Sequence, residues 1–422
     1  HWTGPYQNWN LQCAECHSTH LEKNYNPQSR GYRTTWAEIN VACESCHGPG
    51  ATHVKLAESG GLGRTANAGF PVNLAERGAW AWPEGEDIAV RREQPGSSQQ
   101  VESCGRCHAR RGTLGDYQHG RPLLDTHRPA LLLDPLYHPD GQILDEVYVY
   151  GSFVQSKMHQ AGVVCSNCHE PHSNQLRAPG NGVCAQCHKP ASYDTPDHHR
   201  HPAGSPGAAC ANCHMPAQNY MVIDARRDHS MRIPRPDLSV ALDTPNACNQ
   251  CHVDRDALWA VNSLREWGVH FSDASTHPAR SFDLARKGDG RAVPGLVQLA
   301  RDPEAASIVR ATAMNELAGF SNREALETAV RLLDSKDPML RWTAASTLRM
   351  LPLQHRYGVL APLMEDDITT VRLEVARLLA EVPLDQVSPE DARRLQTLFD
   401  EYLEIMGRQA DTPEGQLEMG LF

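Results

Sequence analysis

The segment 165–214 contains CSNCHEPHS at 165–173, CAQCH at 184–188 and CANCHMP at 210–216, which are three copies of Cys-x-x-Cys-His. Four more copies lie outside it, so seven motifs use all 14 cysteines of the chain. The motif is the attachment signature of haem c, in which two thiols bond to the porphyrin and the histidine is the proximal iron ligand. The sequence therefore predicts seven covalently bound haem c groups. Their cysteines are Cys13, Cys16, Cys43, Cys46, Cys104, Cys107, Cys165, Cys168, Cys184, Cys187, Cys210, Cys213, Cys248 and Cys251, and their proximal ligands are His17, His47, His108, His169, His188, His214 and His252.

Other uses of cysteine explain this pattern less well. Structural zinc sites pair Cys-x-x-Cys units but do not require a histidine after every second cysteine. A thioredoxin-like pair would occur once, near a βαβ pattern. A disulfide framework would show scattered spacings rather than one repeated spacing.

Length and charge narrow the class of protein. A chain of 422 residues predicts two or three domains. Residues 1–252 carry 21 basic and 24 acidic groups, a net charge of −3, and residues 253–422 carry 19 and 27, a net of −8. Such an acidic balance speaks against nucleic-acid binding. The sequence shows no apolar run long enough to span a bilayer and no signal peptide. Since haem c is attached outside the cytoplasm, we expect an export signal upstream of His1 and a periplasmic, extracellular or cell-surface location in a prokaryote.

The haem-binding part leaves little protein for an ordinary core. Seven motifs within residues 1–252 predict that the porphyrins supply most of the apolar interior and that this part unfolds without them. We expect three haems in residues 1–164, four closely spaced haems in 165–255, and a repeat domain in 256–422. The alternating segment QILDEVYVY at 142–150 predicts a short strand or hairpin.

Helical periodicity replaces the cysteine motifs after His252. Val309-Arg310-Ala311, Leu340-Arg341-Trp342 and Val371-Arg372-Leu373 recur every 31 residues, and each arginine is followed seven positions later by a leucine. Asp302-Pro303 and Asp337-Pro338 predict helix starts, each with an N-cap and a proline at the first helical position. The pattern favours an α-solenoid of HEAT-like helix pairs, and chance periodicity in a plain helical bundle is the alternative. A further helix is expected at 391–405, and PEGQLEMGLF from Pro413 is similar to the opening of a tetratricopeptide repeat.

The predicted fold class is therefore mainly α with much irregular structure. A multihaem cytochrome c domain with little β structure would be followed by the α-solenoid.

Histidines outside the motifs decide whether each iron is closed by a second ligand or open for chemistry. Fifteen of the 22 histidines remain after the proximal ligands are assigned. The distal candidates lie in turns or loops near the motifs or at the ends of the haem-binding part, and one member of the cluster at 198–201 is expected to ligate; they are His1, His53, His138, His172, His198, His199, His201, His229 and His277.

Several stretches together resemble one family. HWTGPYQNWNLQCAECHST, EINVACESCHGPG, GQILDEVYVYGSF, CSNCHEPHS, RRDHSMRIPRPDLSV and TPNACNQCH are similar to multihaem c-type cytochromes of the doubled Cys-x-x-Cys-His class that carry C-terminal HEAT-like and tetratricopeptide repeats. The resemblance implies export, electron transfer and a further haem motif upstream. It also implies distal ligation by His1, His53, His138, His172, the 198–201 cluster, His229 and His277.

Two functions remain open from the sequence. The first is an electron carrier in which mostly bis-His haems form a chain, with redox proteins or further copies of itself as partners and a polymeric extracellular filament, or nanowire, as one form. The second is a multihaem reductase or oxidase that acts on a small nitrogen or sulfur compound at one five-coordinate haem. All seven motifs end in histidine, so the lysine that marks the catalytic haem of pentahaem nitrite reductases is missing, and no catalytic residue is predicted. A scaffold in which the haems are only structural is the weakest hypothesis, because seven irons exceed what stability requires.

Overall fold

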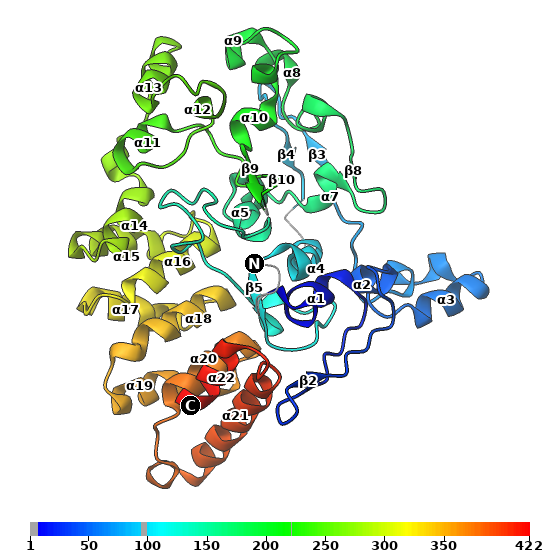
Figure 1. Ribbon diagram of the computed structural model, residues 1–422, viewed down its shortest axis with the longest axis vertical. Coiled ribbons are helices and arrows are strands. Elements are labelled where there is room, and N and C mark those ends of the chain that lie inside the picture. The colour runs from blue at the N-terminus through cyan, green and yellow to red at the C-terminus, as the bar shows by residue number, and fades with distance from the viewer. Residues whose placement is uncertain (1–6, 94–98, 221) are drawn as a thin grey trace. The chain divides into compact units, whose positions relative to one another are not determined.

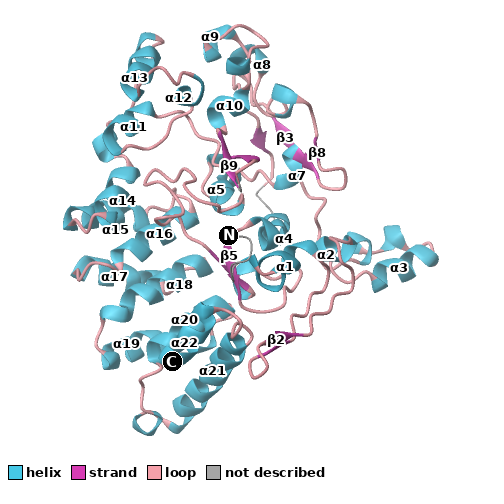
Figure 2. Cartoon of the chain, viewed as in Figure 1, coloured by secondary structure: helices cyan, strands magenta, loops and turns pink. Residues whose placement is uncertain are grey.

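Short helices and long irregular segments make up most of the molecule. The computed structural model describes residues 7–93, 99–220 and 222–422 (Figures 1 and 2). The strands form five separate two-stranded antiparallel sheets, in which each strand has two to four residues. The predicted fold class, mainly α with little β structure and a helical repeat region, is confirmed.

The described chain divides into two compact units. One contains His1–Glu76, Gln99–Pro129 and Leu333–Phe422, and the other contains Arg77–Ser98 and Ala130–Leu332. Each unit combines haem motifs with repeat helices: the first three motifs share a unit with the last repeats, and the last four motifs share a unit with the first repeats. The sequence-based domain ranges stay a prediction.

The unit with four motifs contains two short strand pairs and a β-hairpin among its helices. Its strands are β3 (Trp80–Ala81), β4 (Val90–Arg91), β7 (His169–Glu170), β8 (Gln175–Leu176), β9 (Ala217–Tyr220) and β10 (Asp224–Arg227), and its helices are α5 (Tyr150–Val154), α6 (Lys157–Gln160), α7 (Cys165–Cys168), α8 (Pro190–Tyr193), α9 (Pro196–His199), α10 (Cys210–His214), α11 (Pro236–Leu242), α12 (Cys248–Cys251), α13 (Ala257–Glu266), α14 (Pro278–Arg286), α15 (Val293–Arg301), α16 (Ser307–Leu317) and α17 (Arg323–Leu332).

The unit with three motifs has the same mixture of elements. Its strands are β1 (Tyr25–Asn26), β2 (Gly31–Tyr32), β5 (Arg111–Thr113) and β6 (His127–Pro129), and its helices are α1 (Ala14–His17), α2 (Cys43–His47), α3 (Ala51–Glu58), α4 (Gln99–His108), α18 (Pro338–Thr347), α19 (Leu353–Leu360), α20 (Thr369–Leu379), α21 (Pro389–Gly407) and α22 (Pro413–Leu421). Thus α21 confirms the helix predicted at 391–405. The stretch from Pro413 is helical, and its assignment to a tetratricopeptide repeat stays a prediction.

Residues related by the repeat period of 31 have the same structural environment in successive repeats. Arg310, Arg341 and Arg372 lie in α16, α18 and α20. The leucines seven positions later, Leu317, Leu348 and Leu379, are each fully buried. Seven residues are about two helical turns, so each leucine lies near the helix face of its arginine but further along the axis.

One of the two predicted helix starts is confirmed. The Asp337 carboxylate accepts a hydrogen bond from Met339 N at 2.9 Å, and Pro338 is the first residue of α18. The prediction at Asp302 is wrong, because α16 begins at Ser307. Asp302 instead accepts a hydrogen bond from Glu304 N at 3.0 Å, in a local turn that ends before the helix.

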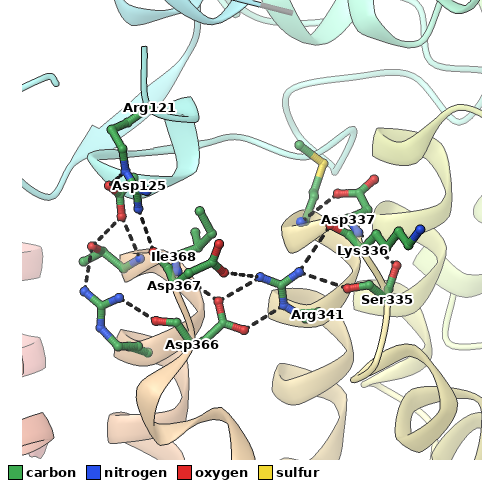
Figure 3. Close-up of polar contacts among 12 residues, drawn as sticks. Arg121, Asp125, Ser335, Lys336, Asp337, Arg341, Asp366, Asp367 and Ile368 are labelled. Atoms are coloured by element: carbon green, nitrogen blue, oxygen red, sulfur yellow. Dashed lines mark hydrogen bonds and ion pairs between the residues drawn. The ribbon is translucent and has the colours of Figure 1, made fainter. Parts of the chain in front are cut away.

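Salt bridges join α18 to the segment directly before α20 in the three-motif unit (Figure 3). Arg341 donates to both carboxylate oxygens of Asp366 at 2.7 and 2.8 Å and to Ser335 O at 2.9 Å. Asp125, close after the third motif, accepts hydrogen bonds from Thr369 N at 3.1 Å and Thr369 Oγ1 at 3.0 Å, so it caps α20. The segment that follows the third motif is therefore anchored on a repeat helix.

The short strand or hairpin expected at 142–150 is present only as one isolated antiparallel bridge. The structure has a single bridge between Tyr137 and Ile143, and α5 already begins at Tyr150. Ile143 and Val147 are buried, but Tyr148 has a φ of 59°, outside the range of a strand. The apolar residues of this segment therefore mark buried positions in an irregular loop.

The four-motif region has almost no apolar core of its own. Among the described residues between 155 and 255, the buried apolar side chains are Ala208, Tyr220, Pro236 and Leu238. In the same range Ile233, Val240 and Val253 are exposed. This distribution fits the prediction that covalently attached porphyrin, rather than protein, fills the interior of this region.

Candidate haem sites

A single helical turn presents the reactive groups of most motifs. Six of the seven Cys-x-x-Cys-His sequences lie within or directly beside a short helix, and the motif at 184–188 forms turns directly after a 3₁₀ helix at Gly180–Val183. On a helix, residues i, i+3 and i+4 lie on the same face. Both thiols and the imidazole of a motif therefore point to one side, as a single macrocycle requires. All 14 cysteines lie within the described residues, and none of them forms a disulfide.

Cysteines of different motifs are close neighbours in the three-motif unit. The Sγ of Cys16, in the first motif, lies 3.9 Å from the carbonyl oxygen of Cys107, in the third motif. The two thiols are also hydrogen-bonded to each other, which raises the pKa of Cys16. Cys46 of the second motif interacts electrostatically with Cys104 of the third. The third motif therefore lies beside both the first and the second.

The four-motif unit shows the same adjacency in sequence order. Cys168 of the fourth motif interacts with Cys187 of the fifth. A hydrogen bond between the thiols of Cys184 and Cys210 joins the fifth motif to the sixth and raises the pKa of Cys210. Cys213 of the sixth motif interacts with both cysteines of the seventh, Cys248 and Cys251. The predicted crowding of these motifs is present in the structure.

Three pairs of histidines lie at the spacing of two ligands on one iron. The ring centres are 6.3 Å apart for His169 and His229, and 6.2 Å apart for both His214–His198 and His252–His201. A histidine nitrogen lies about 2.0 Å from a bound metal and the ring centre roughly 1.1 Å further, so opposed ligands have ring centres about 6.2 Å apart. Each pair joins a motif histidine to a predicted distal candidate. These residues therefore fit a bis-His haem.

Backbone carbonyls orient several of these rings. Nδ1 lies 2.7 Å from Arg232 O in His214, 2.9 Å from Arg227 O in His229 and 2.9 Å from Ala68 O in His53. The Nδ1 of His201 likewise bonds to His199 O. Metal-ligating histidines almost always donate their second ring N–H in this way, because it fixes the tautomer and leaves Nε2 free for the metal.

Two members of the 198–201 cluster, rather than the expected one, lie opposite motif histidines. His198 lies opposite His214, and His201 lies opposite His252. The remaining residue, His199, accepts hydrogen bonds from the backbone N–H and the ring of His201 through its Nδ1 and its carbonyl oxygen. Its place is thus beside a candidate ligand.

The other distal candidates are placed less directly. His53 stacks on Phe70 with ring centres 4.3 Å apart, and Phe70 also contacts His47 at 5.0 Å, so His53 lies near the second motif. His172 is 80% exposed, with Nδ1 3.1 Å from Glu170 Oε1. Burial lowers the pKa of His138 and favours the neutral imidazole that a metal binds.

His277 and His1 complete the candidates. The Nδ1 of His277 accepts a hydrogen bond from Ala279 N at 3.2 Å and caps α14. In the neutral ring this leaves the proton on Nε2, which does not favour ligation through that nitrogen. Burial also lowers the pKa of His277. His1 lies outside the described residues.

Two histidines outside the predicted distal candidates have clear surroundings in the structure. His119 packs against Gly48, directly after the second motif, and its buried Nδ1 has no hydrogen-bond partner in the described part of the chain. Burial, aided by Arg106, lowers the pKa of His119 to about 4, so the ring is neutral and joins the candidate ligands of the second site. His127 is fully buried and both its ring nitrogens are engaged, by Thr126 Oγ1 and Glu15 Oε1, so it is a structural histidine. No local sequence signal separates these two.

Arginines near the motifs mostly bind protein groups. Arg227 donates to Ala211 O, Met215 O and Asn212 Oδ1, all within or beside the sixth motif. Arg232 donates to Asp140 O, Ser230 Oγ and Gln155 Oε1. These side chains hold the motif loops in place.

Comparisons with known proteins agree with this reading. The model of the doubled CXXCH motif matches residues 158–193, which contain the fourth and fifth motifs, and the model of HEAT repeats matches residues 293–380. The match covers the arginine–leucine repeats of α16, α18 and α20.

The chain also aligns with one solved structure, the outer cell wall cytochrome OcwA, over 82% of this chain and 76% of that one, with 16% identity and a TM-score of 0.41. That score is too low to relate individual residues of the two chains. None of the curated proteins matches. The two family matches place the doubled Cys-x-x-Cys-His motif and HEAT-like repeats in one polypeptide, and together they support a multihaem c-type cytochrome with HEAT-like repeats.

Proposed function

We propose that this chain is a heptahaem cytochrome that conducts electrons through a chain of mostly bis-His haems. The three histidine pairs with ring centres 6.2 to 6.3 Å apart carry this proposal. An iron closed on both sides by histidine has no open position for a substrate, so it suits electron transfer.

The residues of each site have distinct tasks. Two cysteines of each motif would hold the porphyrin covalently, and the motif histidine and a loop histidine such as His229 would bind its iron. When bound, haem supplies reversible one-electron chemistry at its iron. The backbone carbonyls of Arg227 and Arg232 accept the Nδ1–H of His229 and His214, which keeps both rings in the ligating tautomer and limits the rearrangement that accompanies electron transfer.

Neighbouring cysteines support an order for the haems. In the four-motif unit the thiol contacts run from the fourth motif to the fifth, sixth and seventh in turn. In the three-motif unit the third motif lies between the first and second. Since each thiol bonds to a porphyrin edge, adjacent thiols bring adjacent macrocycles close together. We infer that electrons pass in sequence through the fourth, fifth, sixth and seventh haems in one unit. In the other unit they would pass from the first haem to the third and then to the second.

The same proposal includes export and a role at or outside the cell surface. Attachment of haem c takes place outside the cytoplasm, and none of the helices in the described residues combines the length and apolar character needed to cross a bilayer. The partners would be redox proteins or further copies of the chain, with the HEAT-like repeats as the docking element. A polymeric filament is the extended form of this proposal, and electron microscopy of the purified protein tests it.

Haem quantification and spectroscopy test the electron-transfer function. We expect seven covalent haems per chain and a ferric protein whose spectrum is low-spin throughout and unchanged by cyanide or nitrite. A high-spin fraction that binds these ligands would favour the multihaem reductase instead. A haem content well below seven would contradict the assigned motifs.

A further inference from the structure

A cluster of charged and polar side chains joins the first Cys-x-x-Cys-His motif to the segment after the third. Glu15 lies between the two cysteines of the first motif. Its Oε2 accepts hydrogen bonds from Arg111 Nη1 at 3.0 Å and from Thr113 Oγ1 at 2.7 Å. Its Oε1 lies 2.8 Å from Nε2 of His127. Three residues that follow the third motif therefore converge on one carboxylate of the first.

The register of the β5–β6 hairpin explains this convergence. Arg111 and Thr113 are two residues apart on β5, so their side chains point to the same face. Thr113 is paired with His127 on β6, and cross-strand partners also share a face. The hairpin thus presents all three donors side by side. It begins three residues after His108, so its position is tied to the third motif.

The cluster lies where the attachment sites of two haems meet. Arg111 also donates to Arg106 O, within the third motif, at 2.6 Å, and its Nη2 lies 3.8 Å from Cys16 Sγ. Cys16 in turn contacts Cys107 O at 3.9 Å. One guanidinium therefore touches the first motif, the third motif and the carboxylate between them.

The cluster is held tightly. The side chains of Arg111 and His127 are 9% and 0% exposed. The hairpin continues into the segment in which Asp125 caps α20, so it is also fixed at its other end. Several charge-assisted hydrogen bonds to one carboxylate in a poorly solvated site stabilise the cluster and also fix the relative positions of its members.

We propose that Glu15 is a positioning residue that fixes the first haem site against the third and, through its negative charge, lowers the reduction potential of this haem pair. The inference rests on the proposed function, since it requires haem at both motifs. A negative charge near an iron stabilises the ferric form, and the effect is larger in a poorly solvated site than at the surface.

The fourth motif offers a matched control. Glu170 follows His169 and pairs with Arg177 Nη2 at 3.1 Å and with His172 Nδ1 at 3.1 Å. Like Glu15, it therefore has both an arginine and a histidine as partners. These contacts are local and open to solvent: His172 is 80% exposed, and the three residues lie within eight positions of one another. Glu170→Gln removes the same charge without loosening a contact between motifs.

The test compares wild type, Glu15→Gln and Glu170→Gln after covalent haem has been counted by mass spectrometry. We expect full haem content in all three. For Glu15→Gln we expect a reduced Soret circular-dichroism couplet, because the relative orientation of two haems is loosened, and an upward shift of the lowest potentials in a redox titration. Glu170→Gln should leave the couplet unchanged and shift the potentials less.

A second pair of variants keeps the proposal testable if Glu15→Gln does not mature. Thr113→Val removes one bond to Glu15 while preserving side-chain shape, and Thr113→Ser retains the hydroxyl. We expect Thr113→Val to reduce the couplet and Thr113→Ser to restore it. An unchanged couplet and unchanged potentials in Glu15→Gln and Thr113→Val, with seven haems present, would overturn the role of Glu15 alone. Absence of haem from the first or third motif of wild type would overturn the proposed function itself.

Discussion

The four-motif region and the HEAT-like repeats are built on opposite principles. In the repeats at 293–380, Leu317, Leu348 and Leu379 are fully buried among other helices, so protein packs against protein. Between 155 and 255 the buried apolar side chains of the described residues are Ala208, Tyr220, Pro236 and Leu238. We therefore expect the order of this region to depend on covalently attached haem. Under the proposed function, haem would supply both stability and electron transfer in the motif region, whereas protein packing alone stabilises the repeats.

Preventing haem attachment should have the largest effect on the difference between the two regions. Chain produced without haem maturation should lose protection from hydrogen exchange throughout 155–255, because the local apolar burial cannot offset the entropy of ordering it. Residues 293–380 should remain protected. Mass spectrometry of exchanged peptides measures both regions in one sample. Equal protection of the two regions would show that the motif region folds on its own.

Removal of one distal ligand should change one haem and leave the fold in place. His198→Ala removes the ring opposite His214, so we expect one high-spin haem in seven that binds cyanide. The matched control is His199→Ala, which alters the adjacent histidine but should keep all haems low-spin. Electron paramagnetic resonance of the ferric proteins checks this. Identical spectra for the two variants would exclude His198 as the ligand.

A substitution in the repeats should have the converse effect. Leu348→Ala deletes a fully buried side chain and should lower the free energy of unfolding by about 2–5 kcal/mol. The haem spectrum and potentials should not change. Thermal unfolding followed by far-ultraviolet circular dichroism gives the stability, and Leu403→Ala, at a 47% exposed position, is the control with little expected effect. Altered haem spectra in Leu348→Ala would show that the repeats shape the haem sites.

The smallest expected effect concerns Asp125, which links the third-motif segment to α20. Burial opposes ionisation, but hydrogen bonds from Arg121 and Thr369 outweigh it and hold the pKa of Asp125 below its usual range. A depressed carboxyl pKa stabilises the fold above the unfolded pKa of about 3.9, and this contribution is lost as the pH falls through the folded value. Asp125→Asn should therefore cost about 1 kcal/mol at neutral pH, because it weakens the charge-assisted hydrogen bonds from Arg121 and Thr369. Denaturant titrations should show this difference in unfolding free energy between variant and wild type at pH 7, and the difference should disappear at acidic pH. The same difference at both pH values would refute this role.

Sequence reasoning could predict the doubled Cys-x-x-Cys-His motif and the repeats, which the family matches support, because both depend on local signals. Cys-x-x-Cys-His is a contiguous motif, and the arginine–leucine spacing repeats along single helices. It failed at 142–150, where alternation in an irregular buried loop imitates a strand, and at Asp302, where a turn precedes the helix. For the distal ligands, which stay predictions, sequence reasoning could supply only a set of candidates. The pairing of His201 with His252, or the convergence of His127 on Glu15, depends on contacts between distant segments that no local pattern encodes.

The identity of the axial ligands in an experimental density map of the haem-loaded protein tests the central claim most directly. We predict Nε2 of His229, His198 and His201 on the irons held by His169, His214 and His252, with the fourth to seventh haems adjacent in the order of their motifs. Water or an empty axial position on any of these three irons, beside a cavity of substrate size, would contradict it.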